Sequence, residues 1–111
     1  MSVLLVSALA LGSGPFGAGP ATVTHTYEIP PGTAARLAAG EPVDVLPAEL
    51  DLRVEDHLVV VNRDDQVHYV GAFPIAPGRR LDKRFADATA LSGYCTLHTG
   101  GRLTINVERR T

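Results

Sequence analysis

Short segments of alternating apolar and polar residues, separated by turn-forming residues, dominate this chain from residue 22 onward. Residues 50–54 (LDLRV), 81–85 (LDKRF) and 103–107 (LTINV) have the period of two that indicates a half-buried β-strand. Residues 58–61 (LVVV) form an unbroken apolar run, typical of a strand that is covered on both faces. About seven or eight such strands, with turns every eight to twelve residues, predict an all-β fold, a Greek-key β-sandwich.

The connections between these strands contain little other structure. Residues 33–40 are rich in alanine and predict one or two helical turns, ended by Gly40 and Pro42. Residues 43–46 predict a brief extended piece, and residues 87–91 predict a loop. The chain should therefore fold as one domain over residues 22–111.

The first part of the chain, residues 1–21, is an apolar segment followed by a Gly/Pro-rich linker, and it resembles a signal peptide. It opens with Met1-Ser2 and has no early lysine or arginine, which a signal peptide normally has. The apolar run is shorter than the roughly 20 residues that span a membrane. We expect export to a periplasmic, extracytoplasmic or cell-surface location, with loose membrane association through the N-terminus as the alternative.

Charge and cysteine content argue against nucleic-acid binding and against a disulfide-stabilised fold. The formal net charge is -2 and the chain contains a single cysteine. A phosphate backbone attracts basic surfaces, so we expect no nucleic-acid partner. One cysteine cannot form an internal disulfide, and we expect a monomer held together by packing, hydrogen bonds or a metal.

Three side chains in two segments carry the chemistry. Cys95 is followed three residues later by His98, and His68 lies about thirty residues upstream, just after the strand that ends at Asn62. One thiolate and two imidazoles are the equatorial ligands of a blue-copper site, because both oxidation states of copper accept them. The two segments can converge at one end of a sandwich.

From about Glu49 to Val107 the chain resembles the cupredoxins, the plastocyanin, azurin and amicyanin family of type 1 blue copper proteins. The resemblance rests on residues 52–56, the strand ending at Asn62, the spacing from Asn62 to His68, and the segment Tyr94-Cys95-Thr96-Leu97-His98. It implies that His68, Cys95 and His98 hold one Cu(I)/Cu(II) ion. It also implies one-electron transfer to a redox partner protein and no enzymatic activity.

The sequence departs from the family pattern at three points. The only methionine is Met1, so no axial thioether follows His98; the axial ligand would be absent, a water or the Val67 carbonyl, and the reduction potential should rise. Many members have an asparagine directly after the first histidine, which ties the two ligand loops together. This chain has Tyr69 there, and Asn62 could partly take over that role. Glu55 stands where the family turn usually has glycine.

Other functions remain open beside electron transfer. The protein could carry or buffer copper without redox turnover, or be a structural or interaction domain with a vestigial metal site. A buried cysteine can also be a small apolar core residue. A Cys95–His98 nucleophile and base would lack an orienting residue, and a structural zinc site would lack a fourth ligand.

Surface roles follow from the same resemblance. His98 is expected to be the more exposed imidazole and the port for the electron. Phe73, Pro74 and Leu97 are candidates for an apolar docking patch at that end. We interpret His25 and His57 as structural or surface residues, because nothing pairs them with other ligand types.

Overall fold

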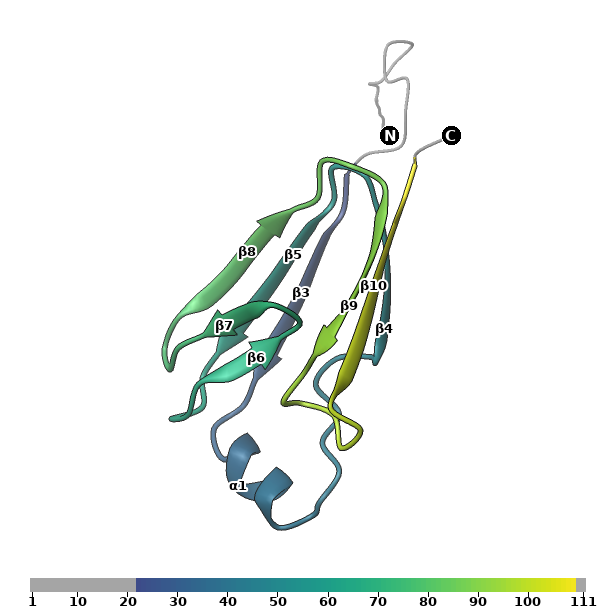
Figure 1. Cartoon of the computed structure of the whole chain (residues 1–111). Coiled ribbons are helices and arrows are strands. Elements are labelled where there is room, and N and C mark those ends of the chain that lie inside the picture. The colour runs from purple at the N-terminus through teal and green to yellow at the C-terminus, as the bar shows by residue number, and fades with distance from the viewer. Residues whose placement is uncertain (1–21, 110–111) are drawn as a thin grey trace, which may run out of the picture.

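A computed structural model describes residues 22–109 of the chain. These residues form eight strands and one short helix (Figure 1). In chain order they are β3 (Thr24–Ile29), α1 (Thr33–Ala38), β4 (Glu49–Arg53), β5 (His57–Asn62), β6 (His68–Val70), β7 (Phe73–Ile75), β8 (Arg80–Arg84), β9 (Thr89–Tyr94) and β10 (Arg102–Glu108). The signal-like segment predicted for residues 1–21 lies outside the described residues.

The strands form two three-stranded sheets that face each other (Figure 1). One sheet has the order β4-β10-β9 and the other has the order β3-β5-β8. In each sheet the central strand is parallel to one neighbour and antiparallel to the other. The hairpin β6-β7 forms a separate two-stranded sheet. The prediction of an all-β sandwich is confirmed.

The core between the sheets is mainly aliphatic. In β10, Leu103, Ile105 and Val107 are at most 3% exposed, and Leu50 and Leu52 of β4 lie in register beside the last two. Burying one such side chain contributes about 1.5–3 kcal/mol to folding. The apolar run predicted as a doubly covered strand is β5, in which residues 58–60 are all buried.

The structure differs from the local expectations at two places. The loop expected at residues 87–91 is cut short, because β9 begins at Thr89 and pairs antiparallel with β10 through Ala90 and Leu91. Most of β9 is exposed on both faces, so its sequence has no alternation to reveal it, and the hydrogen bonds offered by β10 decide its conformation. Residues 43–46 form no strand.

The helical turns predicted after residue 32 are present as α1, which lies at one end of the sandwich (Figure 1).

Glu55, in the turn after β4, has a left-handed backbone conformation with φ 77°. It is the only non-glycine residue with a positive φ among those that the structure describes. Glycine takes this conformation without strain, whereas a residue with a side chain rarely adopts it. Within residues 22–109, no helix has the length and apolarity of a membrane span.

Candidate metal centre

His68 is the first residue of β6, and its imidazole is almost fully buried. Nε2 lies 2.8 Å from Oδ2 of Asp64, four residues earlier in the turn that follows β5. Nδ1 lies 3.0 Å from the hydroxyl oxygen of Thr96, the residue after Cys95. Both ring nitrogens therefore have protein partners, and the orientation of the ring is fixed.

The Asp64 carboxylate is the anchor of this arrangement. It is 3% exposed and accepts hydrogen bonds from the backbone N–H groups of Gly32, Ala34 and Asp65 at 2.8–3.0 Å, besides the bond from His68. Burial alone would raise the pKa of Asp64, but these four bonds outweigh burial and hold the pKa well below its ordinary value. Asp64 is therefore ionised at neutral pH.

The ionised carboxylate fixes the direction of its hydrogen bond to His68. An aspartate anion can only accept, so Nε2 of His68 carries the hydrogen and donates it to Asp64. The Thr96 hydroxyl accepts the backbone N–H of Tyr69 at 3.0 Å and can donate its own hydrogen to Nδ1 of a neutral ring. In that tautomer Nδ1 holds the lone pair.

Asn62 closes the turn that carries Asp64. Its Nδ2 donates to the carbonyl oxygens of Gln66 and Ile75 at 2.8 and 2.9 Å, and its Oδ1 accepts the N–H of Asp64. These contacts tie the end of β5 to the β6-β7 hairpin. Asn62 therefore supports the ligand loop of His68 through all three contacts.

Cys95 lies directly after β9, and its side chain is fully buried. Its backbone N–H donates to the carbonyl of Gly101, and the Gly101 N–H donates to the carbonyl of His98, so the loop is closed on itself. Burial raises the pKa of the Cys95 thiol, against a smaller lowering by the backbone N–H of Leu97. A metal ion would have to displace the thiol proton to bind there.

His98 lies in the same loop and is partly exposed. Its Nε2 is 2.7 Å from the carbonyl oxygen of Leu46, and its Nδ1 is 3.1 Å from that of Arg102. A pocket of about 370 Å³, lined by Pro42 and Val43 among others, opens beside the ring. His98 is thus more exposed than His68, as expected from the sequence.

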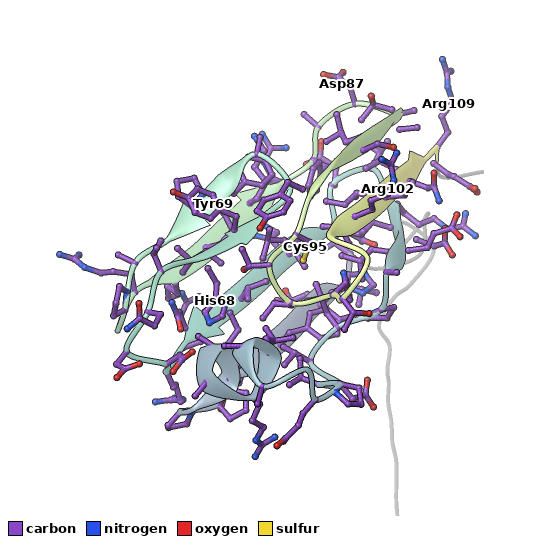
Figure 2. All side chains as sticks on the ribbon, turned by 60° about the horizontal axis from the view of Figure 1, so that its bottom comes forward. His68, Tyr69, Asp87, Cys95, Arg102 and Arg109 are labelled. Carbon is purple, nitrogen blue, oxygen red and sulfur yellow. The ribbon has the colours of Figure 1, made fainter. Side chains whose placement is uncertain are left out.

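The backbone brings the two segments together. Val70 and Cys95 form a β-bridge, and the Thr96 N–H donates to the carbonyl of Tyr69 at 3.0 Å. Figure 2 shows His68 and Cys95 at the end of the sandwich that carries α1. Within residues 22–109, however, no three His, Cys, Asp or Glu side chains are gathered closely enough to hold a metal ion.

The donor atoms are therefore of the kind that copper requires, but the rings are turned toward protein partners. To bind a metal ion together with Cys95, Nδ1 of His68 would have to leave the Thr96 hydroxyl. The His98 ring would have to leave one of its two carbonyl partners. The bond from His68 Nε2 to Asp64 can persist through such a change.

The remaining histidines each pair with one carboxylate. His25 Nε2 lies 3.1 Å from Asp56, and His57 Nδ1 lies 3.0 Å from Asp82 in a half-exposed contact. The His57 contact is the leading cause of the lowered pKa of Asp82. Neither histidine belongs to a metal-ligand group among the residues described.

The docking patch expected near the site needs one correction. Leu97 is only 1% exposed and belongs to the core, so it cannot contribute to a surface patch. Pro74 is exposed and Phe73 is partly exposed. The exposed aromatic residues flanking the candidate ligands are instead Tyr69 and Tyr94, whose ring centroids are 6.4 Å apart.

Sequence reasoning missed the two residues that orient His68. These residues are Asp64 and Thr96, and the sequence pattern assigned a role to neither of them. The available signal was an acidic residue four positions before a histidine, because a carboxylate is a common partner of the second nitrogen of a ligand histidine.

Comparison with known proteins supports the architecture. No protein-family model and no curated protein matches the sequence. Among solved structures, a purple cupredoxin from Nitrosopumilus maritimus is similar over 76% of this chain and 99% of its own, with a TM-score of 0.51 and 20% identity. Amicyanin from Paracoccus versutus is similar over 83% and 87%, with a TM-score of 0.51 and 17% identity. The chain therefore has the cupredoxin-like β-sandwich fold.

Proposed function

We propose that the chain binds one copper ion through His68, Cys95 and His98 and transfers single electrons to a partner protein. The proposal is supported by the fold, by the donor atoms at one end of the sandwich, and by the bridge between Val70 and Cys95. Copper bound by a thiolate and imidazoles supplies a one-electron couple. The chain supplies the ligands and the rigid sandwich that limits their movement.

The observation that carries the proposal is the hydrogen bond between Asp64 and Nε2 of His68. In metal sites, a ligand histidine commonly donates its second ring N–H to a carboxylate, which fixes the tautomer and raises the basicity of the ligand nitrogen. Asp64 would do both for His68 and leave Nδ1 as the nitrogen with the lone pair. The Thr96 hydroxyl lies 3.0 Å from that nitrogen.

His98 would serve as the electron port, because it is partly exposed and borders an open pocket. Its Nε2 can keep the bond to the Leu46 carbonyl while Nδ1 turns from Arg102 to the metal. No methionine follows His98, so an axial ligand would come from the Val67 carbonyl or a water, or be absent. The partner protein and the export of the chain remain part of this proposal.

A copper titration of the protein tests the proposal, with visible absorption and electron paramagnetic resonance as readouts. We expect one equivalent of Cu(II) to give an intense charge-transfer band and narrow hyperfine splitting, both lost in Cys95→Ser. Asp65→Asn, beside the anchor on the exposed part of the turn, is the matched control and should leave both signals unchanged. A colourless protein, or a signal that survives Cys95→Ser, would overturn it.

Two alternatives have distinguishable results. A copper carrier would bind Cu(I) tightly and show no reversible couple in voltammetry. A metal-free interaction domain is favoured by the protein partners found at all four ring nitrogens of His68 and His98. That alternative requires an unfolding temperature that copper leaves unchanged, since a ligand that binds only the native state must raise it.

A further inference from the structure

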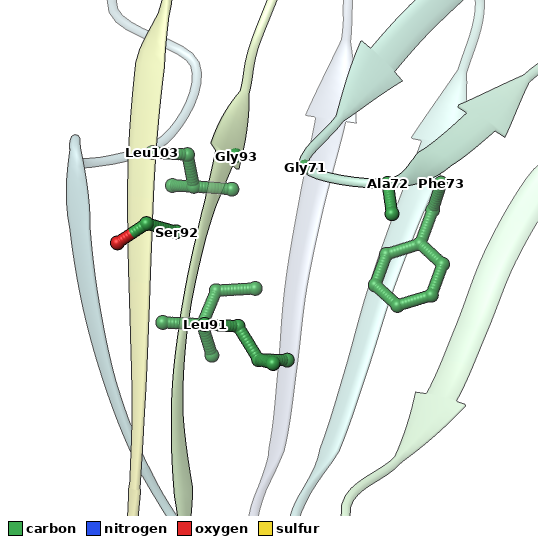
Figure 3. A pocket seen from close by; sticks show the side chains of 8 residues that line it. Gly71, Ala72, Phe73, Leu91, Ser92, Gly93 and Leu103 are labelled. Carbon is green, nitrogen blue, oxygen red and sulfur yellow. The ribbon is translucent and has the colours of Figure 1, made fainter.

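The sandwich has a second feature that the copper proposal does not use. An apolar pocket of about 170 Å³ lies between β9 and the turn that joins β6 to β7 (Figure 3). Gly71 and Gly93 face each other at one end of the pocket, where a Cβ on Gly93 would stand only 2.9 Å from the Cα of Gly71. Leu91 and Phe73 line its other end (Figure 3). The backbone of β9 therefore contacts the β6-β7 turn at the two glycines, and the pocket lies next to this contact.

A wider and more polar pocket of about 460 Å³ lies next to this apolar pocket and shares Phe73 and Leu91 with it. Lys83 lines this outer pocket, with Nζ 5.8 Å from the ring centroid of Phe73 and 5.9 Å from that of Phe85. Contacts of this kind hold an ammonium group over aromatic rings. The result is an apolar chamber with a positioned cation at its mouth.

The charge of Lys83 is not neutralised by a neighbour in the described part of the chain, where it forms no ion pair. The second cation at the mouth, Arg84, is already paired with Glu55. Asp87 also lines the mouth, and it lies at the outer tip of the loop between β8 and β9 (Figure 2). Lys83 is therefore the cation that is available to an anion entering over Phe73.

We propose that this pocket binds a small amphipathic carboxylate, with its apolar body in the chamber and its carboxylate beside Lys83. The size fits, because an apolar cavity of about 150 Å³ holds a benzene-sized molecule. The polarity also fits, since no charged group lines the chamber and an ion is costly to bury without a partner. The charged end of the ligand must then remain at the mouth, where Lys83 complements it.

Phenylacetate is the probe, titrated into the full chain without copper and followed by amide chemical shifts in nitrogen–proton correlation spectra. We expect saturable shifts at Leu91, Ser92 and Phe73, with a dissociation constant in the millimolar range for so small a ligand. Neutral phenylacetamide should bind about fourfold more weakly, as expected for the loss of one exposed ion pair. Acetate, which has no apolar body, should give no saturable shift at these amides.

Two variants separate charge from shape. Lys83→Gln should lower the affinity for phenylacetate about fourfold and leave phenylacetamide unchanged. Arg79→Gln removes a charge outside both pockets and is the matched control, which should bind phenylacetate as the parent does. Ala72→Leu places a larger side chain in the chamber and should weaken both ligands about tenfold or more.

The same spectra give the results that would overturn the proposal. One is the absence of saturable shifts at the chamber in the parent protein. Another is equal binding of phenylacetate by Lys83→Gln and the parent. Shifts of the chamber amides with protein concentration alone would assign this face to a second copy of the chain instead. None of these outcomes depends on copper, so failure here leaves the metal proposal standing.

Discussion

Replacing Asp64 should be the most destabilising single change in the turn that carries His68. The carboxylate accepts three backbone N–H groups and the Nε2–H of His68, all at 2.8–3.0 Å, and it is 3% exposed. Two of the backbone donors, Gly32 and Ala34, belong to the start of α1, which has no side-chain cap of its own. Asp64 therefore joins α1, the turn and the candidate ligand in one buried network.

The expected loss can be estimated from these contacts. Asp64→Ala leaves these buried donors without an acceptor, at about 1–3 kcal/mol for a buried polar group, so we expect a total loss of about 4 kcal/mol. Asp64→Asn keeps an acceptor oxygen and should cost about 2 kcal/mol. With a urea m-value of about 2 kcal/mol/M, a loss of about 4 kcal/mol lowers the unfolding midpoint by about 2 M.

Urea unfolding of the metal-free protein, followed by far-ultraviolet circular dichroism, measures this loss. Asp65→Asn is the control, because its side chain is exposed on the same turn and should change stability by less than about 0.5 kcal/mol. If Asp64→Asn and Asp65→Asn unfold at the same urea concentration, the buried network does not hold the turn and the reasoning fails.

The same network predicts how stability depends on acid. The pKa of Asp64 is lower in the folded protein than its ordinary value of 3.8, so the unfolded chain binds more protons as the pH falls. The stabilisation is fully present above about pH 4 to 5 and is lost progressively below that range. Asp64→Asn should flatten this acid limb, and an unchanged limb would show that Asp64 is not its cause.

Three further predictions follow from single contacts. Thr96→Val should cost about 1–2 kcal/mol, because it removes the hydroxyl between Nδ1 of His68 and the Tyr69 N–H; an unchanged unfolding midpoint would contradict this. Gly93→Ala should cost at least about 1–3 kcal/mol through the 2.9 Å approach to Gly71, measured by thermal unfolding against Gly100→Ala, which meets nothing within 4 Å. Cys95 should react with iodoacetamide far more slowly in the folded, metal-free protein than in urea, because its thiol is buried and its pKa is raised; equal rates would refute this.

The alternation of apolar and polar residues was enough to predict the sandwich. Leu103, Ile105 and Val107 are buried as their spacing indicates, and so are Leu50 and Leu52. The strand β9 was missed over its first half because its residues are exposed on both faces and carry no period. The conformation of β9 depends on its hydrogen bonds to β10. A local pattern of residues within β9 does not contain these contacts with another strand.

The sequence supplied the candidate ligands of the site but not their hydrogen bonds. The spacing of Cys95 and His98 and the position of His68 after a buried strand are visible in the sequence. The partners of His68 are not, because Asp64 becomes an anchor only when α1 folds back and presents the N–H groups of Gly32 and Ala34. Such long-range contacts, rather than local propensity, set the orientation of the ring.

The most direct test of copper ligation is X-ray absorption at the copper edge of the loaded protein, compared with the loaded His68→Gln and Cys95→Ser variants. The account predicts one sulfur and two imidazole nitrogens around copper. It further predicts loss of the sulfur contribution in Cys95→Ser and of one imidazole in His68→Gln. A coordination shell of nitrogen and oxygen alone in the parent protein, unchanged in both variants, would contradict the account.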